Sequence, residues 1–298
     1  MPLPEKIEIT EVGPRDGFQN VKGFIPTETK VRVIDAIAAA GVPEIEITSF
    51  VHPAAVPQMA DASEVAEAVL QKHRGKVQLV ALVPNKRGAE NAAKCGLEKV
   101  TYVISASEAH NQSNVKRTAE ESFVDLYRLR ESLPHLSVKL SLATAFGCPF
   151  EGGVPLARVV ELVENALACG VGEIVLCDTI GIANPVQVME VVGAVRGVTK
   201  ELPLGMHMHD TRGLGLANML AGMMAGVSRF ETSVGGLGGC PFAPGSAGNT
   251  ASEDAINMVH EMGVRTGIDL VKYMEAVAIV KREIQANLSG RLSGISCK

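Results

Sequence analysis

Two histidines separated by one residue are the strongest candidates for chemistry in this chain. The stretch His207-Met208-His209-Asp210 ends a short apolar run that begins at Leu204. If the run is a β-strand, alternate side chains share a face, so the two imidazoles point the same way. Two imidazoles at one strand end can bind a metal ion together, although paired histidines also occur as hydrogen-bonded core or edge residues. The pair by itself leaves both interpretations open.

Two oxygen donors elsewhere in the chain would complete a metal site. Asp16 lies in the segment Gly-Pro-Arg-Asp-Gly, and Asn249 follows Gly248. Two oxygens and two imidazoles that leave positions open for substrate oxygens suit octahedral Mg²⁺ or Mn²⁺. Structural zinc normally recruits pairs of thiolates, which this chain lacks. Each donor has a plainer alternative: Asp16 could form the turn before Gly17, and Asn249 could cap a helix that starts near Ser252.

Arg15 and Cys240 are the remaining reactive candidates. Arg15 is permanently charged, and at the mouth of a site it would neutralise charge on a carbonyl or enolate oxygen. Its alternative is an ion pair with Asp16 or Glu46. Cys240 follows the run 235–239 (GGLGG), and such a glycine-dense loop can move and approach a ligand closely. A lone cysteine is usually a small buried apolar residue, but on such a loop it is a candidate acid or base.

Alternating strand-like and helix-like patterns would position these residues. Short apolar runs predict strands at 7–12, 44–49, 77–83, 100–105, 138–143, 173–177, 204–209 and 230–234. Patterns rich in Ala, Leu, Val and Glu predict helices at 27–40, 61–72, 155–169, 185–199, 214–225, 252–262 and 270–288. We expect Thr27 to cap the first helix, and Gly41, Gly170, Gly226 and Gly263 to end the helices that precede them.

These repeats define an α/β fold. Eight β/α units in about 260 residues, with no linker between them, predict one closed (β/α)₈ TIM barrel. A doubly wound open sheet is the competing α/β fold, but no G-x-G-x-x-G follows the first strand and no P-loop motif occurs. We place the catalytic barrel at residues 1–268, and a short C-terminal helical extension with a flexible tail at 269–298.

The barrel would gather the candidate residues at one end. In this fold the active site lies at the carboxyl ends of the strands. The candidates fall at those ends: Arg15 and Asp16 after the first strand, Glu46 in the second, Asp178 after the sixth, the histidine pair in the seventh and Cys240 after the eighth. The sequence therefore predicts an ionisable rim around a metal site.

Composition and charge narrow the class of protein. The 298 residues are 46% hydrophobic and 4% aromatic, with a formal net charge of −5. Because no long run of lysine or arginine occurs, we expect no binding to nucleic acid. No apolar segment reaches the roughly 18 residues of a membrane span, and the N-terminal residues lack the pattern of a signal peptide. The six cysteines form no C-x-x-C pair, so we expect a cytoplasmic protein with reduced thiols.

Seven segments, in this order along the chain, resemble the 3-hydroxy-3-methylglutaryl-CoA lyase family. They are 12–20 (VGPRDGFQN), 46–53 (EITSFVHP), 56–59 (VPQM), 104–108 (ISASE), 178–181 (DTIG), 207–211 (HMHDT) and 233–241 (SVGGLGGCP). That family belongs to a superfamily of metal-dependent TIM barrels that also includes isopropylmalate and homocitrate synthases. The resemblance covers nearly the whole chain, and the order and spacing of the segments make it specific.

The resemblance implies an activity and a set of site residues. The implied reaction is retro-Claisen cleavage of 3-hydroxy-3-methylglutaryl-CoA, an acyl-CoA substrate, to acetyl-CoA and acetoacetate, as in leucine degradation. The implied ligands of a divalent cation, Mg²⁺ or Mn²⁺, are Asp16, His207, His209 and Asn249. Arg15 would bind substrate and stabilise the enolate of acetyl-CoA, Cys240 would be a mobile-loop catalytic thiol, and Glu46 and Asp178 would be supporting acidic residues. The resemblance also implies a homodimer.

Departures from the family pattern leave the acyl group open. They include Phe18, Val21, Arg212 and Leu214. Arg212 matters most, because a cation two residues beyond Asp210 could alter the charge recognised near the metal; its alternative is a solvated rim arginine. By strand alternation Asp210 faces away from the histidines, and we expect it to orient the loop that contains Arg212.

Other activities remain as alternatives. A related 3-hydroxy-3-carboxymethyl acyl-CoA or a citramalyl-CoA-like thioester could be the substrate. A Claisen-condensing synthase of the same superfamily is disfavoured, because only about 35 residues follow the eighth barrel helix. A catalytically silent ligand-binding barrel is disfavoured because a pure binder would not need a thiol on a glycine-rich loop.

Overall fold

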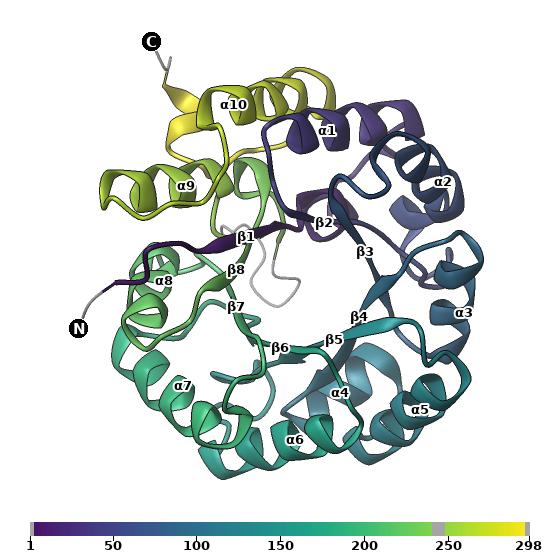
Figure 1. Ribbon diagram of the computed structural model, residues 1–298, viewed down its shortest axis with the longest axis vertical. Helices are drawn as coiled ribbons and strands as arrows, with labels where there is room; N and C mark the ends of the chain where they lie inside the picture. The colour runs from purple at the N-terminus through teal and green to yellow at the C-terminus, as the bar shows by residue number, and fades with distance from the viewer. Residues whose placement is uncertain (1–2, 240–247, 296–298) are drawn as a thin grey trace.

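The structure is a computed structural model that describes residues 3–239 and 248–295. Eight strands of the described chain close into a parallel barrel in sequence order, with helices around the outside (Figure 1). The predicted (β/α)₈ TIM barrel is thereby confirmed. The strands are β1 Glu8–Glu11, β2 Glu44–Ser49, β3 Gln78–Val83, β4 Lys99–Ser105, β5 Ser137–Ala143, β6 Glu173–Asp178, β7 Leu204–Met208 and β8 Arg229–Thr232.

Burial of the strands accounts for their apolar sequences. Every residue of β2, β6 and β7 is buried, as expected for a parallel sheet with helices packed on its outer face. The hydrophobic core includes Ile45, Leu176 and Met206. The strands also bury charged residues, among them Lys139 in β5 and Glu231 in β8. Those two residues bear on the site at the carboxyl ends of the strands.

The helices agree with the predicted pattern over most of the chain. They are α1 Thr27–Ala39, α2 Ala62–His73, α3 Lys86–Lys94, α4 Glu108–Val115, α5 Ala119–Ser132, α6 Leu156–Ala168, α7 Pro185–Thr199, α8 Gly215–Met224, α9 Ser252–Glu261 and α10 Leu270–Ile279. The four predicted stop glycines, Gly41, Gly170, Gly226 and Gly263, all have positive φ, as the ends of helices favour. Within the described ranges, no helix is long and apolar enough to cross a membrane.

The start of α1 differs from the prediction. Pro26 occupies the N-cap, and Thr27 is the first helical residue. The Thr27 hydroxyl donates to Asp61 Oδ2 at 2.7 Å instead of capping its own helix. The prediction that Thr27 caps α1 is therefore wrong, because a tertiary partner takes its hydroxyl and proline already suits the start of a helix.

The helices between β3 and β5 are ones that the sequence patterns did not single out. Helix α3 buries only Gly88, Ala89 and Ala92, residues too small to produce a clear apolar stripe. Helix α5 begins with a capping box in which Thr118 and Glu121 satisfy each other's backbone N–H groups. That T-x-x-E signal was available in the sequence and would have located α5.

Helix α10 is shorter than predicted and lies beside α1 (Figure 1). It ends at Ile279, where a π-helical turn, Val280–Ile284, leads to Gln285 with a φ of +52°. A helix over 270–288 is therefore wrong. Further on, the Ser289 N–H donates to the Gly235 carbonyl at 3.0 Å, so this segment supports the loop that follows β8. The division of the chain at 268/269 into barrel and extension stays a prediction.

Candidate metal centre and active site

The two histidines lie at the carboxyl end of β7. His207 is a residue of that strand, and His209 lies just beyond it, where an isolated antiparallel bridge pairs it with Asn249. Both rings are buried, and their centroids are 5.2 Å apart. Strand alternation therefore places both imidazoles together, as the sequence predicts.

Asp16 approaches the histidines from the end of β1. It lies in a tight π-helical turn, Gly13–Gly17. A Cβ atom on Gly13 would lie 2.5 Å from Glu11 Oε1, so the close approach within this turn requires glycine. One possible ligand atom from Asp16 and one from each histidine all lie within 4.8 Å of one another. We call Asp16, His207 and His209 the ligand group.

Unpaired polar atoms at the ligand group fit a divalent ion. His209 Nδ1 and Asn249 Oδ1 are buried and have no hydrogen-bond partner among the described residues, which is uncommon for buried polar atoms. Asn249 Nδ2 donates to Asp16 Oδ2 at 2.7 Å, so the amide oxygen is the free donor atom. Burial and the neighbouring His207 lower the pKa of His209 to about 3. The ring is therefore a neutral imidazole, the form that binds metals.

The contacts of Asn249 connect the ligand group to the loop after β8. Asn249 does not cap α9, because Ala251 occupies that N-cap. Its Nδ2 also donates to the Leu237 carbonyl at 2.9 Å. A Cβ atom on Gly238, whose φ is +125°, would lie 2.4 Å from Nδ2, so glycine lets this loop contact the amide. Cys240, the predicted loop thiol, lies outside the described residues.

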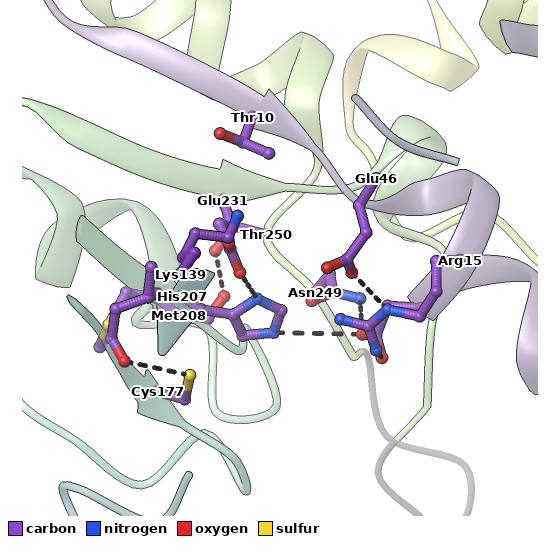
Figure 2. Close-up of polar contacts among 12 residues, drawn as sticks. Thr10, Arg15, Glu46, Lys139, Cys177, His207, Met208, Glu231, Asn249 and Thr250 are labelled. Carbon is purple, nitrogen blue, oxygen red and sulfur yellow. Dashed lines mark hydrogen bonds and ion pairs between the residues drawn. The ribbon is translucent and has the colours of Figure 1, made fainter. Parts of the chain in front are cut away.

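Arg15 is buried next to the ligand group (Figure 2). Its Nε donates to Glu46, and its Nη1 donates to Asp16 at 2.5 Å. Both ion pairs that the sequence left open therefore occur, and they hold the guanidinium at the mouth of the barrel. Burial opposes the charge, but the carboxylates of Glu46 and Asp16 outweigh it and raise the pKa of Arg15. The site thus contains a permanent cation oriented by two carboxylates.

Asp178, the last residue of β6, holds the loop that follows it. Its carboxylate accepts the N–H groups of Ile182 and Ala183, each at 3.0 Å. Burial raises the pKa of Asp178 to about 6 despite these hydrogen bonds. Asp178 therefore lies at the predicted rim, and the hydrogen bonds described for its carboxylate organise its own loop.

Residues beyond the histidines shape the loop between β7 and α8. The Asp210 carboxylate accepts the Gly215 N–H at 2.7 Å, and its carbonyl accepts the Gly213 N–H at 2.9 Å. Asp210 therefore orders this loop, as the sequence analysis expected. Arg212 is exposed on the same loop, which favours the solvated rim arginine over a residue that contacts the ligand group.

A buried set of charges inside the barrel escaped the sequence analysis. Glu44, Lys139 and Glu231, which we call the ionic layer, come from β2, β5 and β8. Lys139 Nζ lies 2.5 Å from Glu231 Oε1 and 3.1 Å from Glu44 Oε1. Figure 2 shows His207 between Glu231 on one side and Arg15 with Asn249 on the other. A signal existed, since a charged residue inside an apolar strand pattern such as 137–143 (SVKLSLA) needs a buried partner.

Glu231 also acts on the charge of His207. His207 Nδ1 lies 3.0 Å from Glu231 Oε2. Burial opposes a charged ring, but the hydrogen bond and the negative charge of Glu231 outweigh it and raise the pKa of His207. The two histidines therefore have different surroundings although they are two residues apart.

A parallel (β/α)₈ barrel with carboxylate, imidazole and guanidinium groups at the carboxyl ends of its strands defines a TIM-barrel enzyme with a candidate divalent-metal site. The HMGL-like family model matches residues 6–280. The chain belongs to this family, whose named relatives below are carbon–carbon lyases.

Known relatives cover the chain almost completely. Hydroxymethylglutaryl-CoA lyase YngG of Bacillus subtilis is 41% identical over 293 residues, which cover 98% of this chain and 97% of that protein. An (R)-citramalyl-CoA lyase of Chloroflexus aurantiacus is 40% identical over 276 residues, covering 89% and 87%. A solved HMG-CoA lyase from Acinetobacter baumannii, in complex with coenzyme A and 3-methylmalate, is 37% identical with a TM-score of 0.93, covering 98% and 95%.

Proposed function

We propose that this protein cleaves 3-hydroxy-3-methylglutaryl-CoA to acetyl-CoA and acetoacetate. The observation that supports this most is that the buried Arg15 forms an ion pair with Asp16 of the ligand group at the mouth of the barrel. The barrel belongs to the HMGL-like family. A metal site beside a fixed cation suits a reaction in which one product leaves as an enolate. Relatives named as hydroxymethylglutaryl-CoA lyases add support from sequence.

The proposed cofactor is Mg²⁺ or Mn²⁺, held by the ligand group and by Asn249 Oδ1. When bound there, the ion would polarise hydroxyl and carbonyl oxygens of the acyl group. Asp16 would offer Oδ2, the oxygen that lies 4.0 Å from His207 Nε2, and His209 its neutral ring. Oxygen and imidazole ligands without thiolates favour such a hard cation.

The chain's own residues would then carry out the rest of the reaction. The substrate's tertiary hydroxyl loses its proton and becomes the ketone of acetoacetate, while the adjacent carbon–carbon bond breaks. Its electron pair passes to the thioester as an enolate, which Arg15 would stabilise because Glu46 and Asp16 fix its position. Protonation of the enolate at its terminal carbon, where the carbon–carbon bond broke, then gives acetyl-CoA. We propose Cys240 as a carrier of these protons, and Asp178 as the support of a loop at the same rim.

A citramalyl-CoA thioester is the second candidate substrate. The Chloroflexus aurantiacus relative named as (R)-citramalyl-CoA lyase is 40% identical to this chain, which lies between the 41% and 38% of relatives named as hydroxymethylglutaryl-CoA lyases. The two thioesters undergo the same type of bond cleavage, so the ligand group and Arg15 suit both. Specificity would then depend on residues around the acyl group.

A substrate panel tests the assignment. Purified protein with Mg²⁺ or Mn²⁺ should release acetyl-CoA and acetoacetate from 3-hydroxy-3-methylglutaryl-CoA, and it should act more slowly on citramalyl-CoA. The His209→Gln variant should lose most of this activity, whereas His135→Gln, an exposed histidine change, should not. Preference for citramalyl-CoA would reassign the substrate, and failure to cleave either thioester would refute the proposal.

Further properties of the protein are proposed from the resemblance alone. They are a homodimeric state, a cytoplasmic location and a place in leucine degradation. Light scattering of the purified protein tests the first, since a monomer at all concentrations would contradict it. The tyrosine variant of Arg212 tests specificity: unchanged preference between the two thioesters would leave Arg212 a solvated rim residue.

A further inference from the structure

The two ring nitrogens of His207 face different groups. Nδ1 lies 3.0 Å from Glu231 Oε2, and Nε2 lies 4.0 Å from Asp16 Oδ2. An ionised carboxylate can only accept hydrogen bonds, so the ring nitrogen that faces Glu231 is the one that bears the proton. Nε2 then directs its lone pair toward the rest of the ligand group.

Glu231 is itself fixed by a buried cation. Lys139 Nζ lies 2.5 Å from Glu231 Oε1, and the Lys139 side chain has no exposed surface. Lys139 comes from β5 and reaches a residue of β8, three strands away in the barrel. Because an ammonium group can only donate, both Glu231 oxygens act as acceptors, one for Lys139 and one for His207.

The other histidine of the ligand group lacks such a partner. His209 Nδ1 is buried and unpaired within the described ranges. His207 is thus the imidazole whose orientation is set before any ion binds. The link runs through side chains from three strands, β5, β8 and β7, which belong to the rigid wall of the barrel.

We propose that Glu231, held by Lys139, is a positioning residue that fixes the tautomer and orientation of His207 so that Nε2 faces the metal. This inference rests on the metal site of the proposed function, and it identifies the residues that prepare that site. A carboxylate that orients a metal-bound histidine typically changes metal affinity by about 10- to 100-fold. Figure 2 shows the contact between Glu231 and the His207 ring as a dashed line.

The variant Glu231→Gln should reverse the tautomer of His207. In Glu231→Gln, the amide oxygen would face Lys139, because the ammonium needs an acceptor. The amide NH₂ would then face His207 Nδ1 and donate to it, which moves the ring proton to Nε2 and blocks that nitrogen as a ligand. Replacing Lys139 with Met in the same protein frees the amide to turn, so that its oxygen again accepts from Nδ1–H.

Metal affinity measures this effect without any enzymatic assay. We expect Glu231→Gln to bind Mn²⁺ about 10- to 100-fold more weakly than the unsubstituted protein in equilibrium dialysis. We expect Glu231→Gln/Lys139→Met to recover most of that affinity. The matched control is Glu173→Gln, since Glu173 accepts from the partly buried Lys99 at 2.7 Å but does not contact His207. Its Mn²⁺ affinity should stay unchanged.

Two results would overturn the proposal. One is Mn²⁺ affinity in Glu231→Gln equal to that of the unsubstituted protein. The other is a double variant that binds Mn²⁺ no better than Glu231→Gln, since a purely structural role predicts additive damage rather than recovery.

A spectroscopic test on the unsubstituted protein depends neither on the Glu231 and Lys139 variants nor on metal binding. In metal-free, ¹⁵N-histidine-labelled protein, at a pH where the His207 ring carries a single proton, long-range ¹H–¹⁵N correlation should report that proton on Nδ1 and a lone pair on Nε2. The signal is assigned by its loss in His207→Gln. A proton on Nε2 alone would overturn the inference. If the unsubstituted protein bound no Mn²⁺, the proposed metal site would fail, while this spectrum would still decide the role of Glu231.

Discussion

Glu253, buried in the first turn of α9, should make the protein lose stability as pH rises. Its Oε2 accepts the Gly235 N–H at 2.9 Å, while its Oε1 is buried without a partner among the described residues. Burial raises the pKa of Glu253 from its ordinary value of 4.5 to about 7, despite the hydrogen bond. Near pH 6 the folded protein therefore holds this group protonated, whereas the unfolded chain has it ionised.

The sign and size of the effect follow from these two pKa values. A carboxyl with a raised folded pKa contributes stability that is complete below the unfolded pKa of 4.5 and is lost as pH rises through about 7. At about 1.4 kcal/mol for each tenfold change in proton affinity, the loss above that range is about 3 kcal/mol. Glu253→Gln keeps the shape of the protonated acid at every pH, so it should not show this loss.

Urea unfolding from about pH 4 to about pH 9 measures the effect. The free energy of unfolding of Glu253→Gln, relative to the unsubstituted protein, should rise by about 3 kcal/mol between the two ends of that range. An amide NH₂ left without a partner adds an offset that does not depend on pH. Glu64→Gln, an exposed glutamate in the first turn of α2, controls for the change in net charge. Parallel curves for Glu253→Gln and the unsubstituted protein would refute the reasoning.

Three more substitutions test the site and the fold. Arg15→Gln leaves buried carboxylates without their cation and should lower the free energy of unfolding, measured in urea, by about 3–5 kcal/mol. The double variant Arg15→Gln/Glu46→Gln should regain part of that stability, while its thioester cleavage stays about 10²- to 10³-fold slower than that of the unsubstituted protein. Recovery of activity in the double variant would contradict the role of Arg15. Gly13→Ala places a Cβ atom 2.5 Å from Glu11 Oε1, so it should cost about 1–3 kcal/mol and weaken Mn²⁺ binding; an unaltered melting temperature would refute this. Gly193→Ala, exposed in α7 with no atom near its Cβ, should instead stabilise by about 1 kcal/mol, and a loss of stability would contradict the described helix.

The order of the barrel could be read from the sequence because its signals are local. Strands such as Glu173–Asp178 are buried over their full length. Glycines such as Gly41 end helices with a positive φ, which glycine adopts easily because it has no Cβ atom. The rule that barrel sites lie at the carboxyl ends of strands then placed Asp16 and the histidines on one rim. In the structure, one possible ligand atom from each of these three residues lies within 4.8 Å of the others, in agreement with that placement.

What the sequence did not predict depends on partners distant in the chain. Lys139 reads as a lone charge in an apolar strand, and only closure of the barrel places it beside Glu231, 92 positions later. The Thr27 hydroxyl likewise bonds Asp61 rather than its own helix. Helix α3 was missed for a different reason, because its buried face consists of residues as small as Gly88 and Ala92, which give no clear apolar pattern. Local patterns do not contain such contacts.

The central claim is that one divalent ion at the ligand group enables cleavage of the thioester. A titration that measures bound metal and enzymatic activity together tests this claim most directly. Metal-free protein is titrated with Mn²⁺ while bound ion and released acetyl-CoA are measured in the same samples. We expect one ion per chain, activity that rises in proportion to bound Mn²⁺, and loss of both in Asp16→Asn. Full cleavage of 3-hydroxy-3-methylglutaryl-CoA by chelator-treated protein, or bound Mn²⁺ without cleavage, would contradict it.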